Sequence, residues 1–249
     1  MAEANLSGIN RTLQILQLVA TSESPLNARD ISGALAIPLS SVYRHLVSLQ
    51  RWGLLSEASG DGSLIAGPLS LQLALRYQND TVLSTLARPL LMRLAKQSQE
   101  TVALMVATHF QAICIDLIES QQALRCAFAP GKGQPLVRGA SAKALLAFMQ
   151  PSHRQEALER NLSTPAERTR LEDELNAIRT AGFAESDSEI DAGVWGLSAP
   201  LFGRPGQLQG VVTVMAPSER GRARRDELLA MTIETARRIS LYLEDEAAN

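Results

Sequence analysis

The sequence has little cysteine, few aromatic residues and almost no net charge. Its only cysteines are Cys114 and Cys126, too few for a disulfide framework, and their spacing fits no zinc pattern. Aromatic residues make up 4% of the chain and the formal net charge is −2. Because the chain as a whole is not basic, any surface for nucleic acid has to be local. We expect no metal and no cofactor.

Long hydrophobic runs are also absent. No apolar stretch approaches the ~20 residues that a helix needs to cross a bilayer. The segment Met1–Asn10 has neither the basic start nor the apolar core of a signal peptide. We therefore expect a soluble, cytoplasmic protein with no membrane partner.

Two short helical patterns meet at a tight turn near the N-terminus, and a further helical pattern over 9–20 precedes them. Asn27 can cap the first of the two, with the carboxylate of Asp30 placed where it favours a helix start. Pro38 forbids a continuous helix through the turn at 36–39. The inner face of this helix is expected to consist of Ile31, Ala34 and Leu35.

The second pattern starts at Ser40 or Ser41 and ends at Gly53, a helix stop signal. Two short strands follow, at 54–56 and 63–66, around an Asp-Gly turn. This order is that of a winged helix-turn-helix, which places its second helix in a DNA major groove. The inner face of the second helix is expected to consist of Val42, Leu46 and Leu49.

The outward face of the second helix is the candidate DNA-reading surface. Arg44 can read a guanine by two hydrogen bonds or hold a phosphate. His45 either packs inward or touches DNA, and we favour packing. Residues 1–78 hold as many acidic residues as arginines, which weakens the electrostatic case for DNA binding. The residues predicted to contact DNA are Asn27, Arg29, Ser40, Ser41, Tyr43, Arg44 and Ser48.

The rest of the chain mixes helices with β-rich runs. Pro89 predicts a kink or break in one helix, and Thr164 with Glu167 forms a capping-box pattern that Gly182 ends. Mixed elements with hairpin-length connections favour an α+β domain around an antiparallel sheet. Helices are expected at 69–77, 82–98, 140–149, about 164–180 and about 222–246. Strands are expected at 101–107, 112–118, 124–128, 194–201 and 209–215, with a Gly/Pro loop at 129–139.

Three stretches resemble one known family. They are Pro135–Leu136 with Gly139–Ala147, Leu171–Gly182, and Ser186–Glu189 continuing through Gly193–Val194 to Ser198–Pro200. The chain resembles IclR-type transcriptional regulators over nearly its whole length. The resemblance implies a winged helix-turn-helix at 1–68, a linker helix at 69–82 and an effector-binding domain of GAF-like fold at 83–249.

A Gly-rich loop stands directly before the helix expected at 140–149. Free amides at a helix start, together with the helix dipole, favour a carboxylate or phosphate; an ordinary helix start is the alternative. In the family, this loop and the last strands enclose a small organic acid. Trp195 stacks on or covers the site only if it points inward. The residues predicted to line the site are Gly139, Ala140, Ser141, Ser186, Trp195, Gly196, Thr213 and Met215.

Three positions depart from the family pattern. Gly196 stands where the family often has Cys, Gly203 where it often has Asp or Asn, and Met215 where a small polar residue is common. Compared with the family, these changes imply a roomier and less polar pocket. The expected ligand is therefore a small organic acid, with a tilt toward an aromatic or longer carboxylic acid.

His109, Cys114 and Asp116 invite a catalytic interpretation. A thiol nucleophile needs a base within reach and a lowered pKa, whereas Cys114 lies in an apolar run and is expected to be a buried small hydrophobe. Ser141 with Lys143 does not have the Ser-x-x-Lys spacing of acylating enzymes. The cluster Arg220–Arg225 is expected to be a solvated face. No catalytic residue is predicted.

We predict a ligand-responsive transcriptional regulator, a repressor rather than an activator. It binds double-stranded operator DNA as a homodimer, because one such helix reads only a few base pairs. The resemblance implies dimers that pair into tetramers. The alternative hypothesis is a small-molecule enzyme whose N-terminal module only dimerises it.

Overall fold

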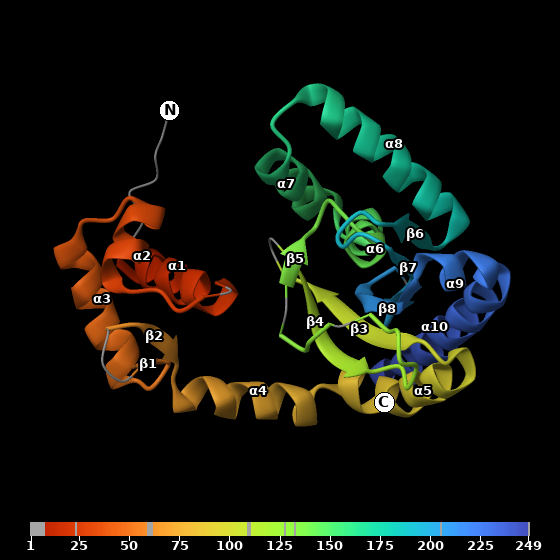
Figure 1. Ribbon diagram of the computed structural model, residues 1–249, viewed down its shortest axis with the longest axis horizontal. Coiled ribbons are helices and arrows are strands. Elements are labelled where there is room, and N and C mark those ends of the chain that lie inside the picture. The colour runs from red at the N-terminus through yellow and green to blue at the C-terminus, as the bar shows by residue number, and fades with distance from the viewer. Residues whose placement is uncertain are drawn as a thin grey trace. The chain divides into compact units, whose positions relative to one another are not determined.

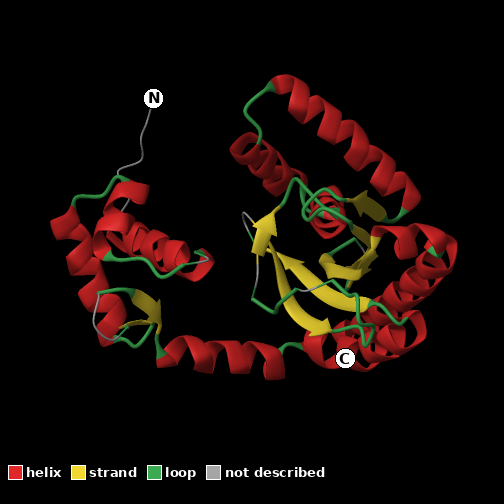
Figure 2. Cartoon of the chain, viewed as in Figure 1, coloured by secondary structure: helices red, strands yellow, loops and turns green. Residues whose placement is uncertain are grey.

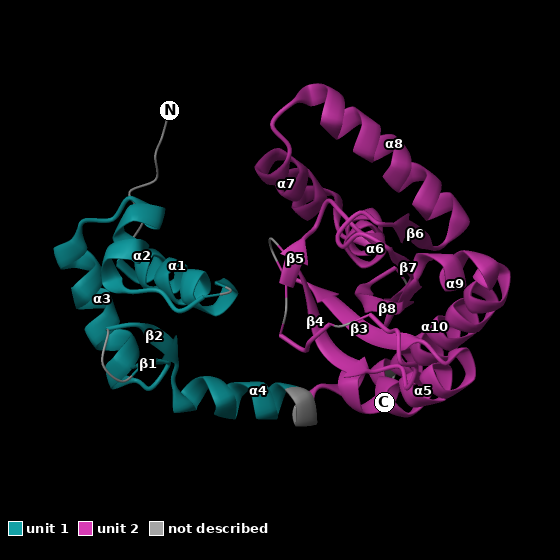
Figure 3. Ribbon diagram, in the orientation of Figure 1, with its two compact units in different colours: residues 1–80 teal, residues 81–249 magenta. Residues whose placement is uncertain are grey.

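The chain folds into two compact units, Met1–Asp80 and Thr81–Asn249 (Figure 3). The computed structural model describes residues 8–22, 24–58, 62–108, 111–126, 128–131, 133–204 and 206–248. The helix predicted as a linker belongs to the first unit. The predicted wing turn at Ser59–Asp61 and the side chain of His109 lie outside the described residues.

The first unit is a winged helix-turn-helix, as predicted (Figure 1). Strands β1 and β2 pair antiparallel, with Leu55 opposite Ala66. Its core is formed by Ile15, Ile31 and the inner face of the third helix. The elements in order are α1 (Gly8–Thr21), α2 (Ala28–Leu35), α3 (Leu39–Arg51), β1 (Leu55–Glu57), β2 (Leu64–Ala66) and α4 (Pro68–Asp80).

A capping box begins α2 as the sequence predicts. The Asn27 side chain accepts hydrogen bonds from the amides of Arg29 (2.8 Å) and Asp30 (3.1 Å), and the Asp30 carboxylate accepts one from the Asn27 amide (2.9 Å). Ile31 is fully buried. The prediction that Ala34 faces the core is wrong: Ala34 is exposed, and Ala28 at the helix start is buried instead.

Helix α3 begins at Leu39, one residue before the earlier of the two predicted starts. Pro38 precedes it with φ −53°, the backbone angle that proline pre-sets for a helix start. Val42, Leu46 and Leu49 are buried, so the predicted inner face is confirmed.

The second unit is an α+β domain around one antiparallel sheet (Figure 2). The sheet has six strands in the order β5-β4-β3-β8-β7-β6, and every neighbouring pair is antiparallel. Its strands are β3 (Thr101–Ala107), β4 (Gln111–Ile118), β5 (Gly133–Pro135), β6 (Ala184–Asp187), β7 (Val194–Phe202) and β8 (Leu208–Pro217). Its helices are α5 (Val82–Ser98), α6 (Ala140–Phe148), α7 (Pro151–Asn161), α8 (Pro165–Ala181), α9 (Ser218–Ala223) and α10 (Arg225–Ala248).

Helices cover both faces of the sheet (Figure 1). Helices α5 and α10 pack on one face, and α6 packs on the other, where α7 and α8 lie against α6. Side chains of a strand alternate between the two faces. Trp195 and Leu197 of β7 therefore join the α5/α10 core, whereas Gly196 faces Ala140 of α6.

Several element predictions were wrong. The described residues of 124–128 form no strand; the extra strand is β5, whose Gln134 pairs with Ala112. The sequence analysis missed α7 and the short edge strand β6. The last helix is two helices, α9 and α10, separated at Arg224. Helix α5 runs unbroken through Pro89, so of the predicted kink or break the break does not occur and the kink stays a prediction.

In the part of the chain that the structure describes, no helix combines the length and apolarity needed to cross a bilayer.

Candidate functional site

Helix α3 presents an exposed face in the first unit. Four of the residues predicted on that face, Ser40, Tyr43, Arg44 and Ser48, are exposed. Val47 is 63% exposed on the same helix, and the sequence analysis missed it. An exposed arginine on this helix can donate two parallel hydrogen bonds to a base edge.

Ser41 does not belong to this face, so that prediction was wrong. Its side chain is buried, and its hydroxyl lies 3.4 Å from Nε2 of His45. Nδ1 of His45 lies 2.8 Å from the Thr12 hydroxyl of α1. Burial, and then the charges of Arg44 and Arg11, lower the pKa of His45. His45 thus holds α1 against α3, as the favoured alternative predicted.

Asn27 and Arg29 stand at the start of α2. The side-chain carbonyl oxygen of Asn27 accepts hydrogen bonds from two backbone amides, so it caps α2. Arg29 is exposed. Of these two residues, Arg29 is the one whose exposed guanidinium can contact a phosphate.

The second unit contains a small cavity at the start of α6. Its volume is about 50 Å³. It brings together seven of the eight predicted residues, namely Gly139, Ala140, Ser141, Ser186, Gly196, Thr213 and Met215. It is also lined by residues that the sequence analysis missed, namely Phe128, Gln134, Ile190, Asp191 and Val194.

The amides at the start of α6 are not free, contrary to the prediction. The Gly139 amide donates to the Glu189 carboxylate at 2.9 Å, and the Ala140 amide donates to the Ser186 hydroxyl at 2.9 Å. The Glu189 carboxylate also accepts from Nζ of Lys143 at 2.6 Å, and Lys143 reaches Glu174 at 2.5 Å. A carboxylate of the chain itself therefore occupies the helix start, the place that favours negative charge.

Hydroxyl and amide groups supply the polar side of the cavity. The Gln134 side chain donates to the Ser141 hydroxyl at 2.7 Å. The Thr213 hydroxyl lies 2.8 Å from that of Ser198. Asp191 is the one formally charged residue among those that line the cavity in the described structure.

The cavity is small in this conformation, and a pocket roomier than those of the family stays a prediction. An engineered cavity that admits benzene has a volume of ~150 Å³, about three times the volume found here. A Cβ at Gly196 would lie 3.4 Å from the Ser186 hydroxyl and 3.5 Å from the Ala140 methyl. A methyl group at position 196 would thus fit in ordinary van der Waals contact with both neighbours, whereas a larger side chain would extend into the cavity.

Trp195 does not reach the cavity. Its side chain is 1% exposed and lies in the core on the α5/α10 face of the sheet. Its Nε1 donates to the Glu185 carboxylate at 2.7 Å. A Cβ at Gly221 of α9 would lie 2.6 Å from the indole, so the ring packs directly on that helix.

The cysteine that invited a catalytic interpretation is inert. Cys114 is buried, and burial, followed by the charge of Asp116, raises its pKa to about 12. Asp116 pairs with Arg88. Among the described residues, no group of three or more His, Cys, Asp or Glu side chains is arranged to hold a metal ion.

The arginines of α9 and the α9–α10 junction are not merely a solvated face. Arg220 forms two hydrogen bonds, of 2.5 and 2.7 Å, with Glu100, which is buried. Arg222 pairs with Asp187 at 2.5 Å and Arg225 with Glu185 at 2.8 Å. Arg222 and Arg225 therefore anchor β6, the strand that carries Ser186 to the cavity.

An exposed helix-turn-helix joined to a separate α+β domain is the arrangement of a class of DNA-binding transcriptional regulators. Residues 8–59 match the model of the IclR helix-turn-helix domain, and residues 76–241 match that of the bacterial transcriptional regulator IclR C-terminal domain. The chain belongs to the IclR family of transcriptional regulators.

Two curated relatives illustrate the match. The chain is 30% identical over 245 residues to the transcriptional regulator BhcR of Paracoccus denitrificans, covering 94% of this chain and 86% of the relative. It is 22% identical over 249 residues to the transcriptional repressor IclR of Escherichia coli, covering 96% and 91%. These relatives are named as regulators of transcription and not as enzymes.

Solved structures agree on the fold. A putative IclR transcriptional regulator from a Silicibacter species superposes with a TM-score of 0.83 at 22% identity, covering 96% of both chains. An IclR homologue from Microbacterium hydrocarbonoxydans, complexed with 4-hydroxybenzoate, gives 0.72 at 21% identity, covering 96% of this chain and 100% of that one.

Proposed function

We propose that this regulator binds double-stranded operator DNA through α3 and changes its DNA affinity when a small organic acid enters the cavity at the start of α6. The observation that carries the proposal is the cavity itself. It brings the hydroxyls of Ser141, Ser186 and Thr213 together beside the start of α6, whose Gly139 and Ala140 amides already donate to Glu189 and Ser186. Cys114 is not activated as a nucleophile, and the described residues contain no group arranged to hold a metal ion, so neither supports a reaction on such a ligand.

On the DNA side, α3 lies in the major groove with Tyr43, Arg44 and Ser48 toward the bases. Ser40, near the start of the helix, contacts phosphate. Arg29 and the side-chain amide nitrogen of Asn27 contact the adjacent phosphates of the DNA backbone. Because this surface carries few cations, one copy binds weakly and two copies share the operator.

On the ligand side, the size of the cavity favours an acid of a few non-hydrogen atoms. An aromatic acid needs Ile190 or Met215 to move outward. Because one structural relative is complexed with 4-hydroxybenzoate, the proposed class of ligands includes aromatic acids. A bound acid shifts the protein only if it binds one DNA-affinity state more tightly than the other.

Helix α4 supplies the apolar surface for the homodimer. Leu71 and Leu75, four residues apart and 62% and 49% exposed, lie on one side of this helix. Leu73 and Tyr77 form a second such pair. Exposed apolar patches of this kind mark interaction sites. We propose that a second copy covers them and that dimers pair into tetramers through the second unit.

Repression is the proposed mode of action, in the cytoplasm where operator DNA is found. Two relatives are named as repressors, one from Escherichia coli and one, of the acetate operon, from Salmonella typhimurium. These names support the proposal only as analogies between regulators of one family.

Footprinting on the DNA upstream of this gene tests the proposal. We expect protection of two half-sites about one helical turn apart, relieved by one member of an acid panel that runs from acetate to benzoate. A thermal-shift screen of the same panel identifies that acid, since a ligand of the folded state raises the melting temperature. Conversion of an acid without any protected DNA would favour the enzyme alternative.

A further inference from the structure

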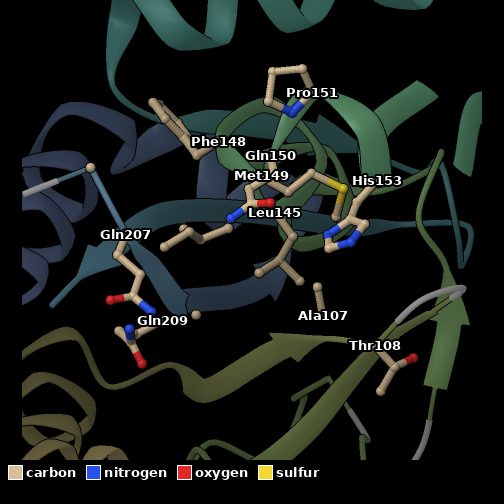
Figure 4. Close-up of a pocket in the computed structure, with 13 residues that line it drawn as sticks. Ala107, Thr108, Leu145, Phe148, Met149, Gln150, Pro151, His153, Gln207 and Gln209 are labelled. Carbon is tan, nitrogen blue, oxygen red and sulfur yellow. The ribbon is translucent and has the colours of Figure 1, made fainter. Parts of the chain in front are cut away.

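The second unit contains a larger cleft at the opposite end of α6 (Figure 4). Its volume is about 770 Å³, within the ~300–1,000 Å³ of typical small-molecule sites. It lies between the C-terminal end of α6, the start of α7, the end of β3 and the connection from β7 to β8. It shares no lining residue with the cavity at the start of α6.

The cleft has an apolar floor. Leu145 is fully buried, and Phe148, Met149 and Leu208 are half-buried beside it. The Phe148 ring meets the Phe202 ring edge-to-face, with centroids 5.6 Å apart and planes at 83°. That contact fixes the orientation of Phe148, so a planar molecule finds a preformed surface.

The polar side chains of the cleft are amides, a hydroxyl and the imidazole of His153. Gln150, Gln207, Gln209 and Thr108 line it, and each of these side chains both donates and accepts hydrogen bonds. Figure 4 shows Gln207 and Gln209 on the β8 side and Thr108 on the β3 side. The side chain of Gln209 packs against Gly203, where a Cβ would lie 3.2 Å from its Nε2. This packing holds the amide in place.

The charges of the lining side chains determine which ligands the cleft can bind. None of the 13 lining residues of the described structure is Asp, Glu, Lys or Arg. His153 is the one titratable side chain among them, so a charged ligand would lose hydration there without meeting a carboxylate, an ammonium or a guanidinium group, which is costly. An uncharged ligand with a flat ring and an amide-like group matches both the floor and the glutamines.

We propose that this cleft is a second small-molecule site, specific for an uncharged planar compound that carries an amide or similar donor–acceptor group. This second site is distinct from the proposed operator-binding surface and from the acid site, because its ligand is neither DNA nor a carboxylate. Both sites use α6, a helix of 9 residues that spans ~13 Å. An occupant of the cleft therefore contacts the helix whose other end faces the acid.

Titration of the full-length protein with benzamide, followed by saturation-transfer NMR, tests the proposal. Benzoate and benzamidine serve as probes of the same shape that carry a charge. Ala107→Trp fills the cleft from the exposed end of β3, and Gly196→Val obstructs only the other cavity. We expect saturable benzamide binding that Ala107→Trp weakens by at least about tenfold and Gly196→Val leaves unchanged. Benzoate is expected not to bind the Gly196→Val protein.

A second variant of unchanged size keeps the test decisive if Ala107→Trp does not fold. Gln209→Glu places a carboxylate in the cleft, so we expect weaker benzamide binding and new benzamidine binding. The proposal is overturned if benzamide does not bind the wild type, or if it binds all variants equally. It is also overturned if sedimentation shows that Ala107→Trp dissociates an oligomer, since a second copy would then cover the cleft.

Discussion

The Glu189 carboxylate accepts a hydrogen bond from the Gly139 amide, with 2.9 Å between Oε2 and N. Its other oxygen lies 2.6 Å from Nζ of Lys143, whose side chain is 3% exposed. One carboxylate of the chain thus neutralises a buried ammonium and the positive end of α6. An acid that enters the cavity meets a helix start that already has an anionic partner.

Glu189→Gln is expected to lower the free energy of unfolding by about 1–3 kcal/mol, because a buried charge and a helix start lose their anionic partner. Lys143 keeps Glu174, which limits the loss. Urea unfolding measures the change. Glu156→Gln, at an exposed position of α7, is the control and should stay within about 0.5 kcal/mol of the wild type. Equal losses in both variants would contradict the role given to Glu189.

Gly196→Val is expected to abolish the thermal shift caused by an acid while leaving operator affinity within about twofold. The valine methyl groups extend into the cavity beyond the Ser186 and Ala140 contacts. Gly196 has ordinary strand geometry, whereas Gly139 has φ +83°, so this position adds no backbone strain. Gly196→Ala, whose methyl group fits at 3.4 Å, is the graded control. An unchanged acid titration of Gly196→Val would remove the cavity from the proposal.

The sequence predicted well the elements with strong local signals. The capping boxes at Asn27 and Thr164 mark the starts of α2 and α8, and Gly182 ends α8 in the left-handed region as expected. The apolar runs of β3 and the periodicity of α5 give their observed bounds. In these cases the residues that decide the structure are neighbours in sequence.

The elements and contacts that the sequence did not predict depend on residues that are distant in sequence. Strand β6 reads AESD, which has no β-pattern, and it exists because β7 pairs with it and arginines bind Glu185 and Asp187. Trp195 and Gly196 exchange faces if the strand shifts by one residue, so pocket residues on β7 could not be assigned from pattern alone. The pairing of Gly139 with Glu189, 50 residues apart, had no local signal.

Arg44→Ala is expected to weaken operator binding by about 1–3 kcal/mol, or roughly fivefold to 150-fold, because a bidentate base contact is lost. Since Arg44 is exposed on α3, stability should change by less than about 0.5 kcal/mol. A gel shift at fixed salt measures affinity, because phosphate contacts make it salt-dependent. Arg170→Ala, at an exposed position of α8, is the control. Wild-type affinity in Arg44→Ala would show that α3 is not read through this side chain.

Asp187 makes stability depend on acid pH. Its carboxylate accepts hydrogen bonds from Arg222 (2.5 Å) and from the hydroxyls of Ser218 (2.8 Å) and Ser188 (2.9 Å). The Arg222 bond, followed by that of Ser218, lowers the pKa of Asp187 from 3.8 to about 2. Because the folded-state pKa lies below the unfolded one, the stabilisation is complete above about pH 5 and is lost as pH falls toward 2.

Asp187→Asn is therefore expected to cost about 1 kcal/mol of unfolding free energy at pH 6, a figure that allows for solvent screening of the exposed Arg222. At pH 3 the difference from the wild type should shrink to about half, because the wild-type contribution is itself being lost. Urea unfolding at the two pH values measures both differences. Asp173→Asn, at an exposed position of α8, should show no such narrowing. A difference that stays constant with pH would mean that Asp187 acts through packing rather than through its charge on Arg222.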